Sequence, residues 1–360
     1  MRGVKEISNL VDVNIKGATT YFAVRASKGL IVINALFVDD NRELLESVQR
    51  NFFSRRNRLN LMVATSIDEA LRIAASQPID VVMSNMSLSG EKGTELLRRV
   101  KQQLHGAVRV VISDHDDKED SMESTSVAHR LMTKPSDTDA IADVIFLSCE
   151  WRDRIKDAAL AELLTDMPSF ASDPGVMREF RETLKGETTA AQLAGIARRD
   201  PALTQKLLQL QGSSFFGPGR NSLDLTMAIS FLRFDTLREL LETPEFTHTD
   251  DSLQPAVADV VQSVRKRCVA SAERTYQRAI DRGVQPREAD EAWVVGLLSG
   301  LGAMTIAELA PEKLGDGDFK RHGAATAYVA RLWGLPSLCC EQLEAFADGR
   351  PMTVSLALAS

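Results

Sequence analysis

Short apolar runs alternate with helical segments over the first part of the chain, and no other feature constrains its fold as much. Between about residues 31 and 150, apolar runs are separated by stretches whose apolar side chains recur at helical spacing. This order is typical of parallel strands joined by crossover helices that cover the sheet. It predicts a doubly wound, five-stranded parallel α/β sheet. Strands are expected near 33–38, 59–64, 79–84, 108–112 and 130–133, and helices near 41–55, 66–76, 92–105, 116–128 and from 137 onward.

Polar residues stand where four of these predicted strands end. Asp39 and Asp40 follow the first apolar run, Asn85 ends the third, Ser113 follows the fourth and Lys134 follows the fifth. In a doubly wound sheet the carboxyl ends of the strands share one edge, and functional groups collect there. We therefore expect these five side chains to form one site.

The order and spacing of these five residues resemble the receiver domain of bacterial two-component response regulators. The resemblance implies that Asp39 and Asp40 form the acidic pair that holds a magnesium ion, and that Ser113 and Lys134 contact a phosphoryl group. Asn85 stands where the family has the aspartate that accepts this group. An amide is not a usable phosphoryl nucleophile at neutral pH, and it gives a hard cation less negative charge than a carboxylate does.

Residues 30–136 are therefore expected to form a pseudo-receiver with a vestigial phosphorylation site. The family has an aromatic residue three positions before the lysine to couple phosphorylation to its docking face. Here that switch position is Leu131, which has neither a hydroxyl group nor a ring edge. Residues 1–29 show no clear strand or helix pattern and are expected to form an irregular N-terminal extension.

A connecting helix over 137–164 is expected next, because this segment lacks glycine and proline. Val144, Ser148, Trp151 and Ile155 recur there at alternating four- and three-residue steps. This stripe is compatible with a coiled-coil seam between two chains. Alternatively, its first half packs on the sheet and its second half on the next domain.

Residues 165–360 contain only helical signals. Asp200-Pro201 pairs an N-cap candidate with proline at the first helical position. Ser222 is expected to cap a helix that carries Leu225. Later helices are expected near 255–281, 290–308, 319–333 and 337–347.

This second half resembles the HDOD domain, an all-helical signalling module related to the HD metal-dependent phosphohydrolases. The similar runs are ARRDPALTQKLL at 197–208, WVVGLLSGLG at 293–302 and RLWGLP at 331–336. The residues taken as the signature are Asp200, Pro201, Leu203, Trp333, Gly334 and Pro336.

The chain departs from the related hydrolases at their metal ligands. Ser299 and Gly300 stand where an adjacent His-Asp pair binds metal in those enzymes, and neither can serve as such a ligand. His248 is expected to be a solvated loop residue, and His322 to begin a helix. Arg233 departs from a turn that contains glycine in the family. These departures predict no catalytic residue, metal or cofactor.

The overall charge limits the classes of partner. Lys and Arg total 43 against 50 Asp and Glu, which gives a net charge of −7, so no nucleic-acid partner is expected. Local basic residues, Arg265 among them, are expected on solvated helix faces, and His105 and His129 on exposed segments. No apolar run suggests a membrane span or a signal peptide. The four cysteines form no CxxC pair and suit a reducing cytoplasm.

Together these observations predict a cytoplasmic, non-enzymatic signal-transduction protein. Its pseudo-receiver and HDOD output module are expected to act by binding signalling proteins. A homodimer is expected either through the 137–164 helix or through the receiver face. The alternative is a residual metal-dependent cyclic-dinucleotide phosphodiesterase of the HD superfamily.

Overall fold

The computed structural model describes residues 32–114, 124, 127–134, 138–167, 169–212, 223–243, 246, 248–311, 314 and 322–350. The chain divides into two compact units. The sheet unit comprises residues up to 113 together with 135–166, and the helical unit comprises 114–134 together with the residues from 167 onward. Three features expected from the sequence lie outside the described residues: the extension 1–29, most of the helix 116–128, and Ser222.

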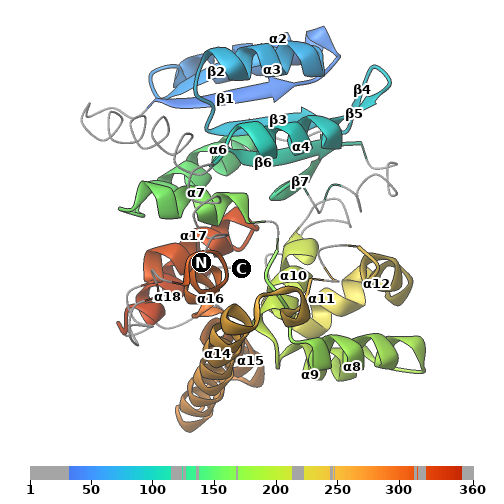
Figure 1. Cartoon of the computed structure of the whole chain (residues 1–360), viewed down its shortest axis with the longest axis vertical. Coiled ribbons are helices and arrows are strands. Elements are labelled where there is room, and N and C mark those ends of the chain that lie inside the picture. Colours follow the sequence, from blue (N-terminus) through green and yellow to red (C-terminus); the bar gives the residue numbers. More distant parts are fainter. Residues whose placement is uncertain are drawn as a thin grey trace, which may run out of the picture. The chain divides into compact units, whose positions relative to one another are not determined.

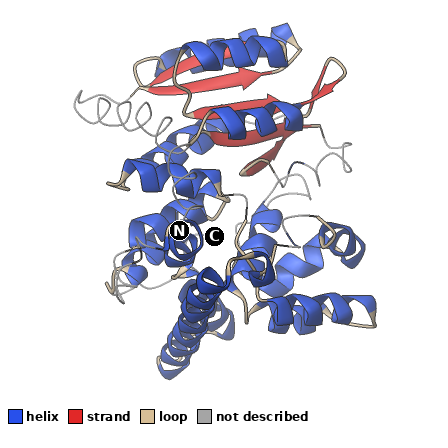
Figure 2. Cartoon of the chain, in the orientation of Figure 1, coloured by secondary structure: helices blue, strands red, loops and turns tan. Residues whose placement is uncertain are grey.

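The predicted five-stranded parallel sheet is confirmed, with strand order β2-β1-β3-β6-β7 (Figures 1 and 2). β1 pairs with β2 in the register Ile33 to Leu59 and with β3 in the register Ala35 to Val81. Its side chains are almost entirely buried, as expected for strands covered on both faces. The strands are β1 (Ile33–Val38), β2 (Leu59–Ala64), β3 (Val81–Asn85), β6 (Val108–Ser113) and β7 (Arg130–Thr133).

The helices of the sheet unit begin at side-chain caps that the sequence supplies. Asn41 accepts a hydrogen bond from the amide of Leu44, and Ser66 accepts one from the amide of Glu69. Such caps satisfy amides that have no partner inside the helix. They begin α2 (Arg42–Phe52) and α3 (Ile67–Ser76), and α4 (Gly93–Gln103) follows the hairpin of β4 (Ser87–Leu88) and β5 (Glu91–Lys92).

The connecting segment forms two helices, α6 (Thr138–Asp153) and α7 (Ala158–Asp166), so the expectation of one continuous helix is wrong. The chain turns after Arg152, whose carbonyl accepts from the amide of Ile155 at 2.9 Å. Asp157 then starts α7 by accepting a hydrogen bond from the amide of Leu160 at 3.1 Å. This local cap competes with helix continuation, which explains the break.

The apolar stripe of α6 is buried within the sheet unit. Val144, Ser148 and Trp151 have relative exposures of 4%, 2% and 2%. Beside them, the buried Arg152 pairs with Asp80 at 2.6 Å, where β3 begins. These contacts favour packing of the first half on the sheet over a seam between two chains. A homodimer through the receiver face stays a prediction.

The last residue of α7, Asp166, is anchored just before β6 begins. Its carboxylate lies 2.7 Å from Nδ1 of His105, accepts from the amide of Gly106 at 3.1 Å and lies 3.6 Å from Nη1 of Arg109. The hydrogen bond with Asp166 raises the pKa of His105. This Asp166 clamp fixes the point at which the chain leaves the sheet unit.

All the named helices after Met167 belong to the helical unit, and they agree with the all-α expectation (Figure 2). The expected helix 290–308 is interrupted at Ser299–Gly300 and forms two helices. The helix that begins at Leu225 is capped by Asp224. The helices are α8 (Pro174–Lys185), α9 (Ala190–Ala197), α10 (Pro201–Gly212), α11 (Leu225–Leu232), α12 (Phe234–Leu240), α14 (Pro255–Asp281), α15 (Pro286–Leu298), α16 (Leu301–Leu309), α17 (Gly323–Leu332) and α18 (Ser337–Ala347).

Residues Pro286–Leu309 are long and apolar enough, by length and composition, to cross a membrane, and 78% of an 18-residue apolar stretch within them is buried inside the structure. The expectation that no run in the chain approaches this length and hydropathy is therefore wrong for this stretch. Core helices of soluble proteins have the same character.

Arg233 joins α11 to α12 with an unusual backbone conformation. Its φ of +60° and ψ of +145° lie in a region that L-residues rarely adopt and that glycine tolerates. The structure therefore keeps a glycine-like turn at a position where the sequence has arginine. The Arg233 side chain is exposed, and within the described residues it makes no hydrogen bond that would offset the strain.

Replacing Arg233 with glycine should raise the free energy of unfolding by about 1 kcal/mol, because relief of a strain of ~1–3 kcal/mol exceeds the extra unfolded-state entropy of glycine. Urea denaturation followed by circular dichroism measures this change. Arg282→Gly is the matched control, since Arg282 is exposed and has a φ of −86°. Stabilisation by the control alone, or a loss of stability in Arg233→Gly, would contradict the strain argument.

Candidate functional site

The polar residues predicted as one site stand at the carboxyl ends of the strands. Asp39 follows β1, is 1% exposed, and accepts a hydrogen bond from the amide of Asn41 at 2.9 Å. Ser113 is fully buried at the end of β6. Lys134 follows β7, where it is half-buried, and Leu131 is buried within that strand. The sheet topology thus brings these strand ends to the edge that the sequence predicts.

Asp40 is held by the turn between β4 and β5. Its Oδ2 accepts hydrogen bonds from both the amide and the hydroxyl group of Ser89, at 2.8 and 2.9 Å. Ser89 has a φ of +47°, a left-handed conformation that directs its amide toward this carboxylate. One of the two acidic residues expected to hold magnesium is therefore engaged by the hairpin.

Asn85 is 9% exposed and uses its amide as a structural donor. Its Nδ2 donates to the backbone carbonyl of Ser87 at 2.6 Å. The backbone carbonyl of Asn85 accepts a hydrogen bond from Oγ of Ser84 at 3.0 Å. The same backbone oxygen approaches Gly93 so closely that a Cβ at Gly93 would lie 1.9 Å from it. A carboxylate cannot donate to the Ser87 carbonyl unless it is protonated. The local packing therefore suits an amide.

In the helical unit, Asp200 occupies a fully buried position at the start of α10. Its Oδ1 accepts from the amide of Leu203 at 2.6 Å, and its Oδ2 accepts from the amide of Asp173 at 2.8 Å. The N-cap role predicted for Asp200 is thus present, with Pro201 at the first helical position.

Arg265 of α14 lies at the centre of a buried ionic network. Its guanidinium group makes two hydrogen bonds to Asp250, at 2.5 and 2.8 Å, and places Nε 2.9 Å from Asp200. It also donates to the carbonyl of Ala171 at 2.8 Å. Burial acts to lower the pKa of Arg265, but the Asp250 hydrogen bonds and the neighbouring carboxylates outweigh burial and raise it. The guanidinium therefore remains charged.

Arg265 is 4% exposed, so the expectation of a solvated helix face is wrong. The burial of Arg265 nevertheless has a signal in the sequence. Val261, Arg265, Cys268 and Ala272 recur at four- and three-residue steps, and all four are buried. An arginine inside such an apolar stripe indicates a buried ion pair.

His248 lies beside this network and is only partly exposed, which corrects the expectation of a solvated loop. Its Nδ1 is 3.2 Å from Oγ of Ser169, and its Nε2 is 3.4 Å from Oε1 of Glu308. Burial lowers the pKa of His248 and raises the pKa of Glu308 to about 7. His129, also expected to be exposed, is 2% exposed.

The late signature residues form a packed corner. The ring of Trp333 is 2% exposed, meets Phe170 edge-on at 4.7 Å between centroids, and lies 5.6 Å from Nζ of Lys206. Gly334 has a φ of +99°, which favours glycine, and Pro336 stands at the N-cap position of α18. Leu203 is 1% exposed, so it and Trp333 belong to the buried core.

Comparison with protein families matches residues 35–146 to the response regulator receiver domain and residues 170–347 to the HDOD domain. The chain is a response regulator receiver domain fused to an HDOD domain. It is therefore a receiver-plus-HDOD signalling protein, as both sequence resemblances predicted.

The receiver domain is similar to several known proteins and solved structures. The hydrogenase transcriptional regulatory protein HoxA of Cupriavidus necator is 27% identical over 112 residues, which are 31% of this chain and 23% of that protein. The chain thus spans less than a quarter of that relative's length. Adenylate cyclase from Rhodopirellula baltica is 26% identical over 32% of this chain and 87% of its own, with a TM-score of 0.30. The signal receiver domain of an HD domain-containing protein from Pseudomonas fluorescens Pf-5 is 22% identical. The match covers 34% of this chain and 98% of that domain, with a TM-score of 0.32.

Ser299 and Gly300 of the HDOD domain serve as a close-packed joint between α15 and α16. The hydroxyl group of Ser299 donates to the carbonyl of Gly296 at 2.7 Å. Thr326 of α17 donates to the carbonyl of Ser299 and accepts from the amide of Gly302. His322 stands at the N-cap position of α17, as predicted. Within the described residues, no three His, Cys, Asp or Glu side chains gather into a possible metal site.

Proposed function

We propose that this protein transmits signals by binding partners and that its receiver domain takes up no phosphoryl group. The observation that carries the proposal is the hydrogen bond from Nδ2 of Asn85 to the Ser87 carbonyl. An amide nitrogen has no lone pair available for attack on phosphorus, and here it is also occupied as a donor. The hydrogen bonds from Ser89 to Asp40 support the same proposal, because they compete with a cation for that carboxylate.

We propose in addition that the HDOD domain is a binding module and not an enzyme. Ser299 and Gly300, at the position of the hydrolases' His-Asp pair, supply no carboxylate or imidazole to a metal. They are instead part of the α15–α16–α17 packing. The four cysteines are free and buried, which is compatible with the cytoplasmic location that we propose.

Acetyl phosphate with magnesium should leave the intact mass of the purified wild-type protein unchanged. A receiver domain with aspartate at the acceptor position serves as the positive control under the same conditions. The measurement is intact-mass spectrometry at several incubation times. A stoichiometric gain of one phosphoryl group that maps to residues 80–90 would contradict the proposal.

Elemental analysis of the untagged protein should give well under one transition-metal ion per chain, and cyclic dinucleotides should remain intact after incubation. The physical reason is that a two-metal hydrolase needs bridging carboxylate and imidazole ligands, which Ser299 and Gly300 do not provide. Two metal ions per chain, together with hydrolysis that a chelator abolishes, would establish the alternative, a residual phosphodiesterase.

A further inference from the structure

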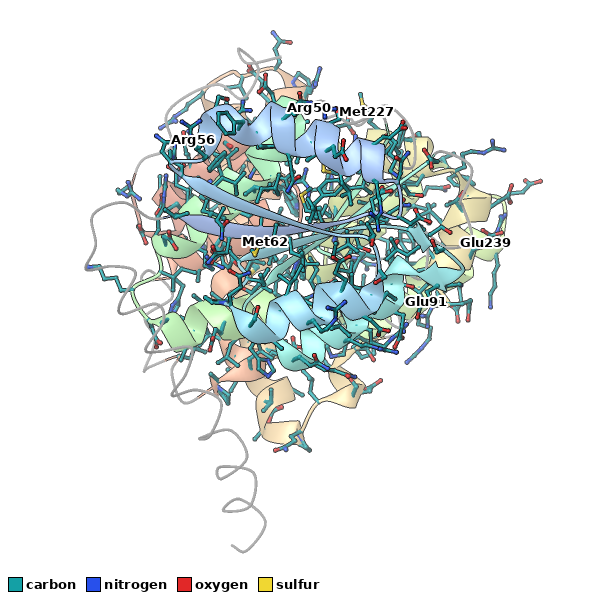
Figure 3. All side chains as sticks on the ribbon, turned by 90° about the horizontal axis from the view of Figure 1, so that it is seen from above. Arg50, Arg56, Met62, Glu91, Met227 and Glu239 are labelled. Atoms are coloured by element: carbon teal, nitrogen blue, oxygen red, sulfur yellow. The ribbon has the colours of Figure 1, made fainter. Side chains whose placement is uncertain are left out.

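Helix α2 ends in a basic and aromatic surface that neither proposal above uses. Phe53 has a relative exposure of 63%, the highest of the large hydrophobic side chains in the described part of the chain. We call this surface the basic-aromatic patch, and Figure 3 shows two of its arginines, Arg50 and Arg56, beside α2. The basic-aromatic patch consists of Arg50, Phe53, Arg55, Arg56 and Arg58.

The charge of this patch is opposite to that of the whole chain. Residues 47–67 contain four arginines and no acidic residue, although the net charge of the chain is −7. Within the described residues, two carboxylates pair with the patch: Glu46 lies 3.6 Å from Arg50, with both side chains largely exposed, and Asp139 pairs with Arg55 at 2.5 Å. Such exposed pairs are weak and can exchange for a partner's carboxylates.

Two of the arginines are held in place before any partner arrives. The guanidinium of Arg56 lies 4.0 Å from the ring centroid of Phe53, and that of Arg58 lies 4.9 Å from the ring centroid of Phe146. Cation–π contacts restrict these long side chains, so less conformational entropy is lost when they bind.

An open hollow of about 500 Å³ adjoins the aromatic ring and is lined by Glu46, Gln49, Arg50 and Phe53. An apolar side chain that enters the hollow covers Phe53, while acidic neighbours on the same segment reach the surrounding guanidinium groups. Arginine and aromatic side chains are the residue types that contribute most to binding at protein interfaces.

We propose that the basic-aromatic patch docks a protein partner through an acidic segment that carries an apolar anchor residue. A nucleic acid fits less well, because its polyanionic backbone is repelled by the net negative charge of the chain. An anionic membrane also fits less well, because Phe53 is the one strongly exposed aromatic side chain among the described residues. This proposal rests on the binding function proposed above, and it specifies the chemistry of the partner that is bound.

Titration of the full-length protein with a fluorescein-labelled amphipathic peptide tests this proposal. The peptide carries glutamates on one helical face and leucines on the other, and its matched control carries glutamine in place of glutamate. We expect saturable binding of the acidic peptide, weakened about tenfold or more by Arg50→Glu combined with Arg56→Glu, and by about three- to tenfold in Phe53→Ala. Arg282→Glu, a charge reversal at an exposed residue of the HDOD domain, should bind as the wild type does.

Several outcomes would overturn the proposal. They are equal affinity for the glutamine peptide, no binding of the acidic peptide, binding unaffected by the patch variants, or tighter binding of duplex DNA or phosphatidylglycerol vesicles. Unchanged thermal unfolding of the variants shows that lost binding is not lost folding. Failure of this titration is distinguishable from failure of the proposed function, because the acetyl phosphate assay tests the receiver without any peptide.

Discussion

Arg265→Ala should lower the free energy of unfolding of the HDOD domain by about 3–5 kcal/mol, because it leaves buried carboxylates without their cation. Asp200 is fully buried, Asp250 is 6% exposed, and Arg265 contacts both. The variant also removes a donor from the buried carbonyl of Ala171. Urea denaturation followed by circular dichroism is the measurement, and aggregation or loss of the helical signal would be the extreme form of the expected result.

Arg267→Ala is the matched control for this experiment. Arg267 lies on the same helix two residues away, but it is exposed, so its removal should change stability by less than about 0.5 kcal/mol. Equal effects of the two substitutions would show that the network contributes nothing specific to stability.

Asn85→Asp should allow acetyl phosphate to add one phosphoryl group, an all-or-none change from the wild type. A carboxylate oxygen at position 85 can attack phosphorus and release acetate, and together with Asp39 it supplies negative charge for magnesium, which then competes with Ser89 for Asp40. The substitution also removes the hydrogen bond to the Ser87 carbonyl, at a cost of about 1–3 kcal/mol. We therefore expect Asn85→Asp to be phosphorylated, and we expect the lost hydrogen bond to loosen the β4–β5 hairpin locally. Intact mass and peptide mapping measure the modification.

Asn85→Ala separates the two effects, since it loses the same hydrogen bond and gains no nucleophile. It should show the loosened hairpin in hydrogen exchange but no gain in mass. The association state of phosphorylated Asn85→Asp should stay unchanged in light scattering, because Leu131 lacks the polar or aromatic group that reports the event in the family. A phosphorylation-dependent change in association would show that the switch survives without its usual residue.

The sequence predicted the sheet well because its signals are local. Each strand is an apolar run bounded by turns, and the polar residues from Asp39 to Lys134 occupy strand ends whose common edge follows from topology. The fold of the second half was likewise predictable from proline and aspartate at helix starts. Asp173 and Asp200 both accept hydrogen bonds there from amides within the first turn.

Contacts between residues distant in sequence could not be predicted in the same way. The pairing of Asp250 and Asp200 with Arg265 depends on how three separate segments pack, and nothing near any of these residues indicates the others. The same holds for Asp40, whose partner Ser89 is 49 positions away. Burial of a charged residue can be suspected from an apolar stripe, but its counter-ion is identified only by the fold.

The Asp166 clamp has a consequence for any message that leaves the receiver domain. Asp166 is bound just before β6 and at its start, by His105, Gly106 and Arg109. Asn85 and Ser113 lie at the other edge of the sheet, where β3 and β6 end. A six-residue strand separates these two edges by about 20 Å. An event at these strand ends would therefore have to be transmitted along the strands to reach Asp166, whereas a partner bound to the loop before β6 would act on Asp166 directly.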